Sequence, residues 1–158
     1  EFEEIANRTL WGQFGENYKA VLDYLANLYE YACAKAIRGE DDLASSENKA
    51  KLTKAIEILL AFRPMIEANI NIVEDSVLKQ NWKALGLHSQ LAERMFHYYL
   101  SDDETEKLEI SKEYNRFARA KMNEFKLYTS ILSHKENYIK SHFLRRSSKG
   151  QSILQSEK

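Results

Sequence analysis

The chain has 158 residues, 44% of them hydrophobic and 30% charged, with five Gly, one Pro and one Cys. This length allows a buried core, and the scarcity of helix breakers favours an all-α fold over any sheet architecture. The single Cys excludes an internal disulfide, and the chain has no apolar run of about 18 residues that could cross a membrane, so we expect a soluble, cytoplasmic protein.

The helical patterns described below predict one domain over residues 3–146. We expect an elongated, mostly antiparallel bundle of about four helices, of which the first and the last are unusually long. Residues 147–158 are polar and are expected to form a disordered tail.

The net charge of −1 hides an asymmetry between the two ends of the chain. Residues 1–103 carry 17 acidic and 11 basic side chains, whereas residues 104–158 carry 7 acidic and 12 basic ones. The balances of −6 and +5 sum to the net charge. A basic C-terminal part suggests an acidic partner, which could be nucleic acid, an anionic lipid surface or the acidic part of the protein itself.

The first predicted helix runs from Glu4 to Arg38 and ends at Gly39. Its outer side carries the candidate acidic contact face, which is Glu16, Asp23 and Glu30 at intervals of seven residues. Apolar residues recur on the other side at spacings of three and four, as in bundles and coiled coils. They are Trp11, Phe14, Tyr18, Val21, Leu25, Leu28 and Ala32, with Leu10, Leu22 and Tyr29 widening the stripe.

A polar loop at residues 40–46 follows, and Ser45 or Ser46 is the expected N-cap of the second helix. That helix repeats the apolar spacing, which Arg63 interrupts and Pro64 follows at once. Its apolar residues are Leu52, Ile56, Leu59, Ile66, Ile70, Val73 and Val77. Proline inside a helix loses one backbone hydrogen bond and clashes with the preceding turn. Either the helix ends near Phe62 or it continues with a kink, and the unbroken apolar register favours the kink.

We expect a turn within residues 78–86, where Gln80, Asn81 and Gly86 weaken the helical pattern, and then a third helix that ends near Leu100. The next residues resemble a capping box, with Ser101 as N-cap and Glu104 three positions later. This cap predicts the start of a fourth helix over residues 103–146, which contains no Gly or Pro.

The outer side of the fourth helix is the strongest functional signal in the sequence. It carries a basic face without an acidic residue, formed by Lys112, Arg116, Arg119, Lys126 and Lys140. Such a face could follow a phosphate backbone. It could equally be a solvated surface, or meet the acidic face of the first helix within one chain or between two.

The sequence contains no pattern that predicts catalysis, a cofactor or a metal site. Glu93 and His97, four residues apart, share a helical face and could supply one edge of a metal site, but the sequence lacks the Glu and Glu-x-x-His pairs that a di-iron site needs. His88, His134 and His142 form no cluster with them. Cys33 lies near a helix C-terminus, which does not activate a thiol, so we expect it to serve packing.

Arg145 and Arg146 precede Ser147 and Ser148, a pattern typical of basophilic kinase sites, so Ser148 is a candidate phosphosite. A phosphate there would reduce the positive charge at this end of the chain.

These patterns predict a non-catalytic interaction module that binds another protein or forms a homodimer through its first and last helices. The alternative is a nucleic-acid-binding accessory subunit that uses the basic face. A more distant alternative is a curved helical dimer that binds anionic membranes through the same side chains.

Overall fold

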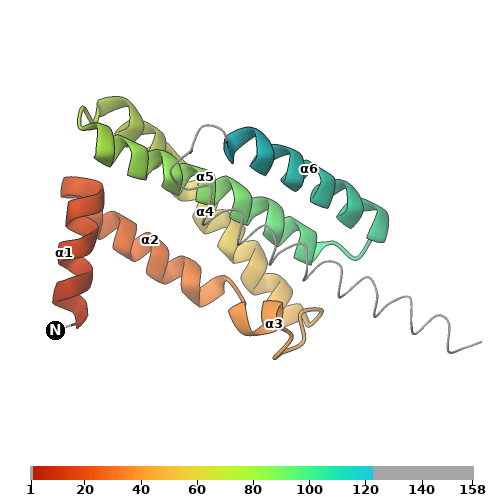
Figure 1. Ribbon diagram of the computed structural model, residues 1–158. Helices are drawn as coiled ribbons and strands as arrows, with labels where there is room; N and C mark the ends of the chain where they lie inside the picture. Colours follow the sequence, from red (N-terminus) through yellow and green to blue (C-terminus); the bar gives the residue numbers. More distant parts are fainter. Residues whose placement is uncertain (1, 123–158) are drawn as a thin grey trace, which may run out of the picture. The chain divides into compact units, whose positions relative to one another are not determined.

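The computed structural model describes residues 2–122, and every regular element in this part of the chain is helical, which confirms the all-α prediction (Figure 1). The elements are α1 (Phe2–Phe14), the 3-10 helix η1 (Gly15–Asn17), α2 (Tyr18–Tyr31), α3 (Ala34–Arg38), α4 (Ser46–Ile72), α5 (Ser76–Leu100) and α6 (Glu104–Met122).

The core lies between α2, α4 and α5, and α4 and α5 run side by side over most of their length (Figure 1). Apolar residues at helical spacing meet there because each helix turns one side inward. Trp82 of α5 is completely buried, as are Leu52 and Leu59 of α4 and Val21 of α2. Packing of helices into a bundle is therefore confirmed.

The single long first helix is not confirmed, because the structure divides residues 4–38 into shorter segments. The backbone takes left-handed conformations at Gly15 (φ 69°) and at Cys33 (φ 51°), and neither fits a continuous right-handed helix. The break removes Trp11 from the predicted apolar stripe, and its side chain is 60% exposed. Tyr29, expected beside that stripe, is 80% exposed.

Contacts with the core hold the turn between α1 and α2 in place. The Phe14 ring packs edge-on against Trp82, with 5.1 Å between ring centroids. Asn81 donates a hydrogen bond from its side chain to the Gln13 carbonyl at 3.0 Å. The Asn17 side-chain amide donates to the Asn69 side-chain oxygen at 2.9 Å.

Helix α4 begins at a predicted N-cap and continues through the proline as predicted, while the expected kink stays a prediction. Ser45 is the N-cap, and its hydroxyl accepts a hydrogen bond from the Asn48 backbone amide at 3.2 Å. The helix then runs through Pro64 to Ile72 without ending. Gly39, in a left-handed conformation, closes the preceding short helix α3, as expected of a residue without a β-carbon.

The turn predicted within residues 78–86 is wrong, because α4 and α5 are joined earlier, by Val73, Glu74 and Asp75. The Asp75 carboxylate caps α5 by accepting from the backbone amides of Val77 and Leu78, each at 2.9 Å. Gly86, read as a turn residue, lies inside α5. A β-carbon there would stand 3.3 Å from Ile66 Cγ2, so this glycine allows α4 and α5 to approach closely.

The N-cap of α6 lies two residues later than predicted, because Asp103 rather than Ser101 caps the helix. The Asp103 carboxylate accepts from the backbone amide of Thr105 at 2.7 Å. The Ser101 hydroxyl instead accepts from the Asp103 amide at 3.1 Å and donates to the Glu106 carboxylate at 2.5 Å. The sequence therefore indicates the correct capping region, but it assigns the N-cap role to the wrong residue.

The packing described above belongs to a unit that ends at Arg116, and a second unit begins at Phe117 within α6. The predicted fourth helix beyond Met122 and the predicted tail at 147–158 lie outside the described residues. None of the helices in the described part of the chain is both long and apolar enough to cross a lipid bilayer.

The close approach at Gly86 generates a stability prediction. Gly86→Val places a branched side chain against Ile66 and is expected to lower the free energy of unfolding by about 1–3 kcal/mol through overpacking. Urea denaturation measures the change. Lys83→Val, on the exposed side of the same helix, is the matched control and should stay within about 0.5 kcal/mol of the original chain.

Combining Gly86→Val with Ile66→Ala tests the cause, because the second change removes the atom that the new side chain meets. The double variant should lose less stability than the sum of the two single changes. Additive losses would contradict a direct clash between these positions.

Candidate functional site

A polar cluster links α4 to α5 inside the bundle. Arg63, the residue that interrupts the apolar pattern of α4, donates from Nε to the Ser89 hydroxyl at 3.2 Å and from Nη2 to the Ser89 carbonyl at 3.3 Å. Nη2 also contacts the Glu93 carboxylate at 2.5 Å. Both charged side chains are about three-quarters buried, so each needs the other to offset its lost hydration.

Tyr24 of α2 borders this cluster and is 3% exposed. Its ring stacks on Phe62, with centroids 4.3 Å apart. Burial raises the pKa of Tyr24 to about 12, while the nearby Ser89 side chain and Arg63 charge act weakly in the opposite direction. Within the described residues, neither its hydroxyl nor the buried indole N–H of Trp82 has a partner at hydrogen-bond geometry.

A half-open cleft of about 510 Å³ lies between α5 and α6. Glu113 accepts a hydrogen bond from Arg94 at 3.2 Å, and Glu106 accepts one from the Ser101 hydroxyl. Two aliphatic side chains, Leu100 and Ile110, supply its apolar surface. The full lining is Glu93, Arg94, His97, Leu100, Ser101, Glu106, Ile110 and Glu113.

The carboxylates that line this cleft are already engaged by other side chains. Their partners are Arg63, Arg94 and the Ser101 hydroxyl. His97 Nε2 is 4.0 Å from the Glu93 carboxylate, so the structure places the predicted pair side by side. Within the described residues, however, no group of His, Cys, Asp and Glu could hold a metal ion.

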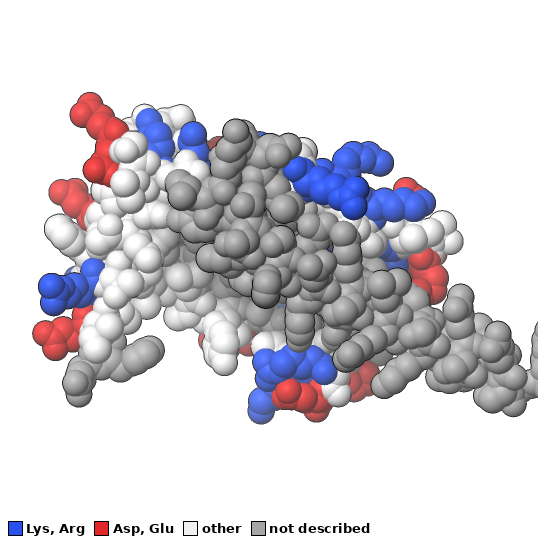
Figure 2. Space-filling view, viewed as in Figure 1, with Lys and Arg blue, Asp and Glu red and all other residues white. Residues whose placement is uncertain are grey.

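The basic face is only partly within the described residues. Lys112 and Arg116 are exposed on α6, and Lys112 forms an ion pair with Glu109 at 2.6 Å. Arg119 is also exposed, whereas Lys126, Lys140 and the candidate phosphosite Ser148 lie outside the described residues. Figure 2 shows basic side chains gathered where α6 runs in Figure 1.

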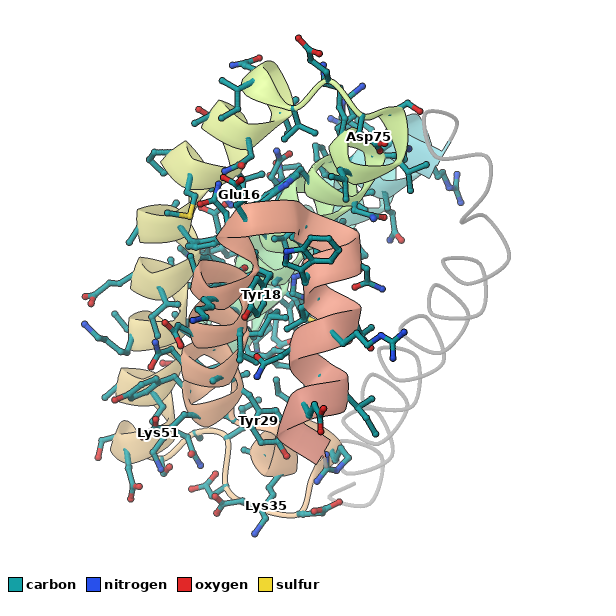
Figure 3. The ribbon with its side chains drawn as sticks, turned by 90° about the vertical axis from the view of Figure 1, so that its left-hand side faces the viewer. Glu16, Tyr18, Tyr29, Lys35, Lys51 and Asp75 are labelled. Carbon is teal, nitrogen blue, oxygen red and sulfur yellow. The ribbon has the colours of Figure 1, made fainter. Side chains whose placement is uncertain are left out.

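The acidic face is exposed, as predicted, but it spans two elements instead of one helix. Glu16 lies in η1, whereas Asp23 and Glu30 lie on α2. None of these carboxylates forms an ion pair with another described residue, so the alternative in which this face meets the basic face within one chain is not seen in this part of the chain. The highly exposed Tyr29 extends from α2, the helix that also carries Asp23 and Glu30 (Figure 3).

Cys33 packs against the start of α4, in agreement with its predicted structural role. Its Sγ lies 3.5 Å from the Asn48 carbonyl oxygen, and burial raises the pKa of the thiol. Asn48 is itself buried and donates to the Asp41 carboxylate at 3.1 Å and to the Asp42 carbonyl at 2.7 Å. Sequence reasoning missed this asparagine. It lies three residues after the N-cap Ser45, in the first turn of α4, from which its side chain reaches the preceding loop.

Comparisons with known protein families, with curated proteins and with solved structures find no match for this chain.

The cluster around Arg63 predicts a stability loss on truncation. Arg63→Ala leaves Glu93 and Ser89 without their partner and should lower the free energy of unfolding by about 1–3 kcal/mol. This loss is smaller than that for a fully buried ion pair, because both side chains are partly exposed to solvent. Lys51→Ala, which removes the exposed ion pair with Glu47, is the control and should cost much less. Equal losses in urea denaturation would contradict a stabilising role for the cluster.

The raised pKa of Tyr24 predicts a loss of stability in alkaline solution. The unfolded chain releases this proton near pH 10, whereas the folded chain keeps it until about pH 12. The original chain should therefore lose up to about 3 kcal/mol relative to Tyr24→Phe as the pH rises from 10 to 12. At neutral pH the two should be similarly stable, because the Phe ring keeps the stacking. A large loss in Tyr24→Phe at neutral pH would contradict the absence of a hydroxyl partner.

Proposed function

We propose that this chain is a non-catalytic helical interaction module that binds another protein through the outer surface of α2. The observation that carries this proposal is the exposed Tyr29 on the helix that also presents Asp23 and Glu30, two carboxylates without an ion-pair partner among the described residues. We call this surface, with Glu16 beside it, the α2 face.

An exposed tyrosine on a helix that also bears exposed acidic side chains has the composition of a protein-binding surface. Tyrosine supplies a large, rigid contact area and is frequent among residues that dominate binding energy. The carboxylates on the same helix would select a partner with basic side chains and speed its association. Helix α2 is held by Val21, Tyr24 and Leu28 in the core, so its outer side is presented on a fixed support.

The nucleic-acid alternative receives less support from the described part of α6. This helix carries five basic and four acidic side chains, a balance of +1, which is small for binding a phosphate backbone. Two of its lysines are also paired with glutamates of the same helix. No observation favours the membrane alternative.

The α2 face is tested by comparing what matched variants bind. The original chain is used to capture binding proteins from a cell extract. We expect two variants to capture less of them: Tyr29→Ala, and the double variant Asp23→Lys with Glu30→Lys. With the captured protein purified, either change should weaken binding at least tenfold, about 1.4 kcal/mol. Helical content, measured by circular dichroism, should not change because these side chains are exposed.

Glu4→Lys combined with Glu109→Lys is the control, because it makes the same change of charge at exposed positions on α1 and α6. Unchanged capture by the α2 variants, or a mass increase on adding a short oligonucleotide that disappears as salt rises, would overturn the proposal in favour of another surface.

A further inference from the structure

Helix α6 joins the bundle in a different way from the other described helices. Each of α1 to α5 places at least one apolar side chain in the core or against it, for example Phe14, Val21, Ile37, Leu52 and Trp82. No described side chain of α6 does so, and none of residues 104–116 is buried. Burial in the core therefore does not hold this part of α6 in place.

The connection that precedes α6 is fixed to the bundle by polar contacts. Lys49 of α4 forms an ion pair with Asp102 at 2.5 Å. The Ser101 hydroxyl donates to the Glu106 carboxylate at 2.5 Å, and Asp103 caps the helix. The first turn of α6 is thus a fixed joint, from which the helix continues beside α5.

Further along α6, an ion pair links the helix to α5. The Glu113 carboxylate accepts from Arg94 Nε at 3.2 Å, and Arg94 Nη1 donates to the Gln90 carbonyl of its own helix at 2.9 Å. The Arg94 side chain is 23% exposed, whereas that of Glu113 is 60% exposed. The half-open cleft described above separates the two helices, so they do not pack closely here.

We propose that residues 104–116 form a strap, the α6 strap, which closes on α5 through the Arg94–Glu113 ion pair and opens while α2, α4 and α5 stay assembled. An ion pair with an exposed carboxylate adds little stability, and salt weakens it further. Opening exposes Leu100 and Ile110, the apolar part of the cleft. The proposal goes beyond the interaction-module function and does not use the α2 face, so each can fail without the other.

Hydrogen exchange reports the opening because the strap is stable only while it lies on α5. A helical segment as short as residues 104–116 is marginally stable in water without tertiary contacts. Its backbone amides therefore lose their hydrogen bonds when the strap leaves α5, and they exchange with solvent at a rate set by the fraction of open molecules.

Hydrogen exchange of the full chain at constant pH, resolved by residue with NMR, tests the α6 strap. Glu113→Ala removes the ion pair with α5 and should speed the exchange of amides 108–116 by about two- to fivefold. Amides of α4 and α5 should keep their rates, because the core is unchanged. Sodium chloride should also speed exchange of the strap in the original chain, and should do so less in Glu113→Ala.

Glu109→Ala is the matched control, because it makes the same change on the same helix but removes an ion pair with Lys112 that lies within α6. It should speed exchange of the strap less than Glu113→Ala does. Equal effects of the two variants, or no effect of Glu113→Ala, would overturn the proposed strap. Amides 108–116 that exchange as slowly as those around Trp82 in the original chain would overturn it as well, because α6 would then open only together with the core.

Discussion

The close packing of α4 against α5 is the contact on which the rest of the described fold depends. Gly86 lets the two helices approach at Ile66, and the buried Trp82 fills the space beside α2 and the turn that precedes it. The same approach brings Arg63 within reach of Ser89 and Glu93. A side chain at position 86 would therefore disturb both the apolar core and its polar cluster.

Sequence reasoning predicted the apolar sides of the helices more reliably than their ends. Leu52 and Leu59 were correctly assigned to the core because helical periodicity reflects burial directly. The breaks at Gly15 and Cys33 were missed because the apolar spacing continues across them, and only the backbone angles reveal the change of direction. Gly86 was misread because glycine serves both turns and close helix contacts, which sequence alone does not distinguish.

For the candidate surfaces too, the sequence predicted some exposed positions but not the contacts between helices. The exposure of Asp23 and Glu30 follows from their place opposite the apolar stripe, and the structure agrees. The partners of Arg63 could not be predicted, because they lie on another helix whose position depends on a turn that was assigned wrongly. The exposure of Leu60, Met65 and Ile72 on α4 was hidden in the sequence, where these residues look like additional core positions until the exposed fractions of their side chains are known.

The construction of α1 has a consequence for native-state motion. None of its described side chains is fully buried, and a left-handed glycine joins it to the 3-10 helix before α2. Its backbone amides can therefore exchange their hydrogens with solvent through a local opening that leaves α2, α4 and α5 assembled. Amides near Trp82 must instead await an opening of the core, so the chain contains two levels of protection against solvent.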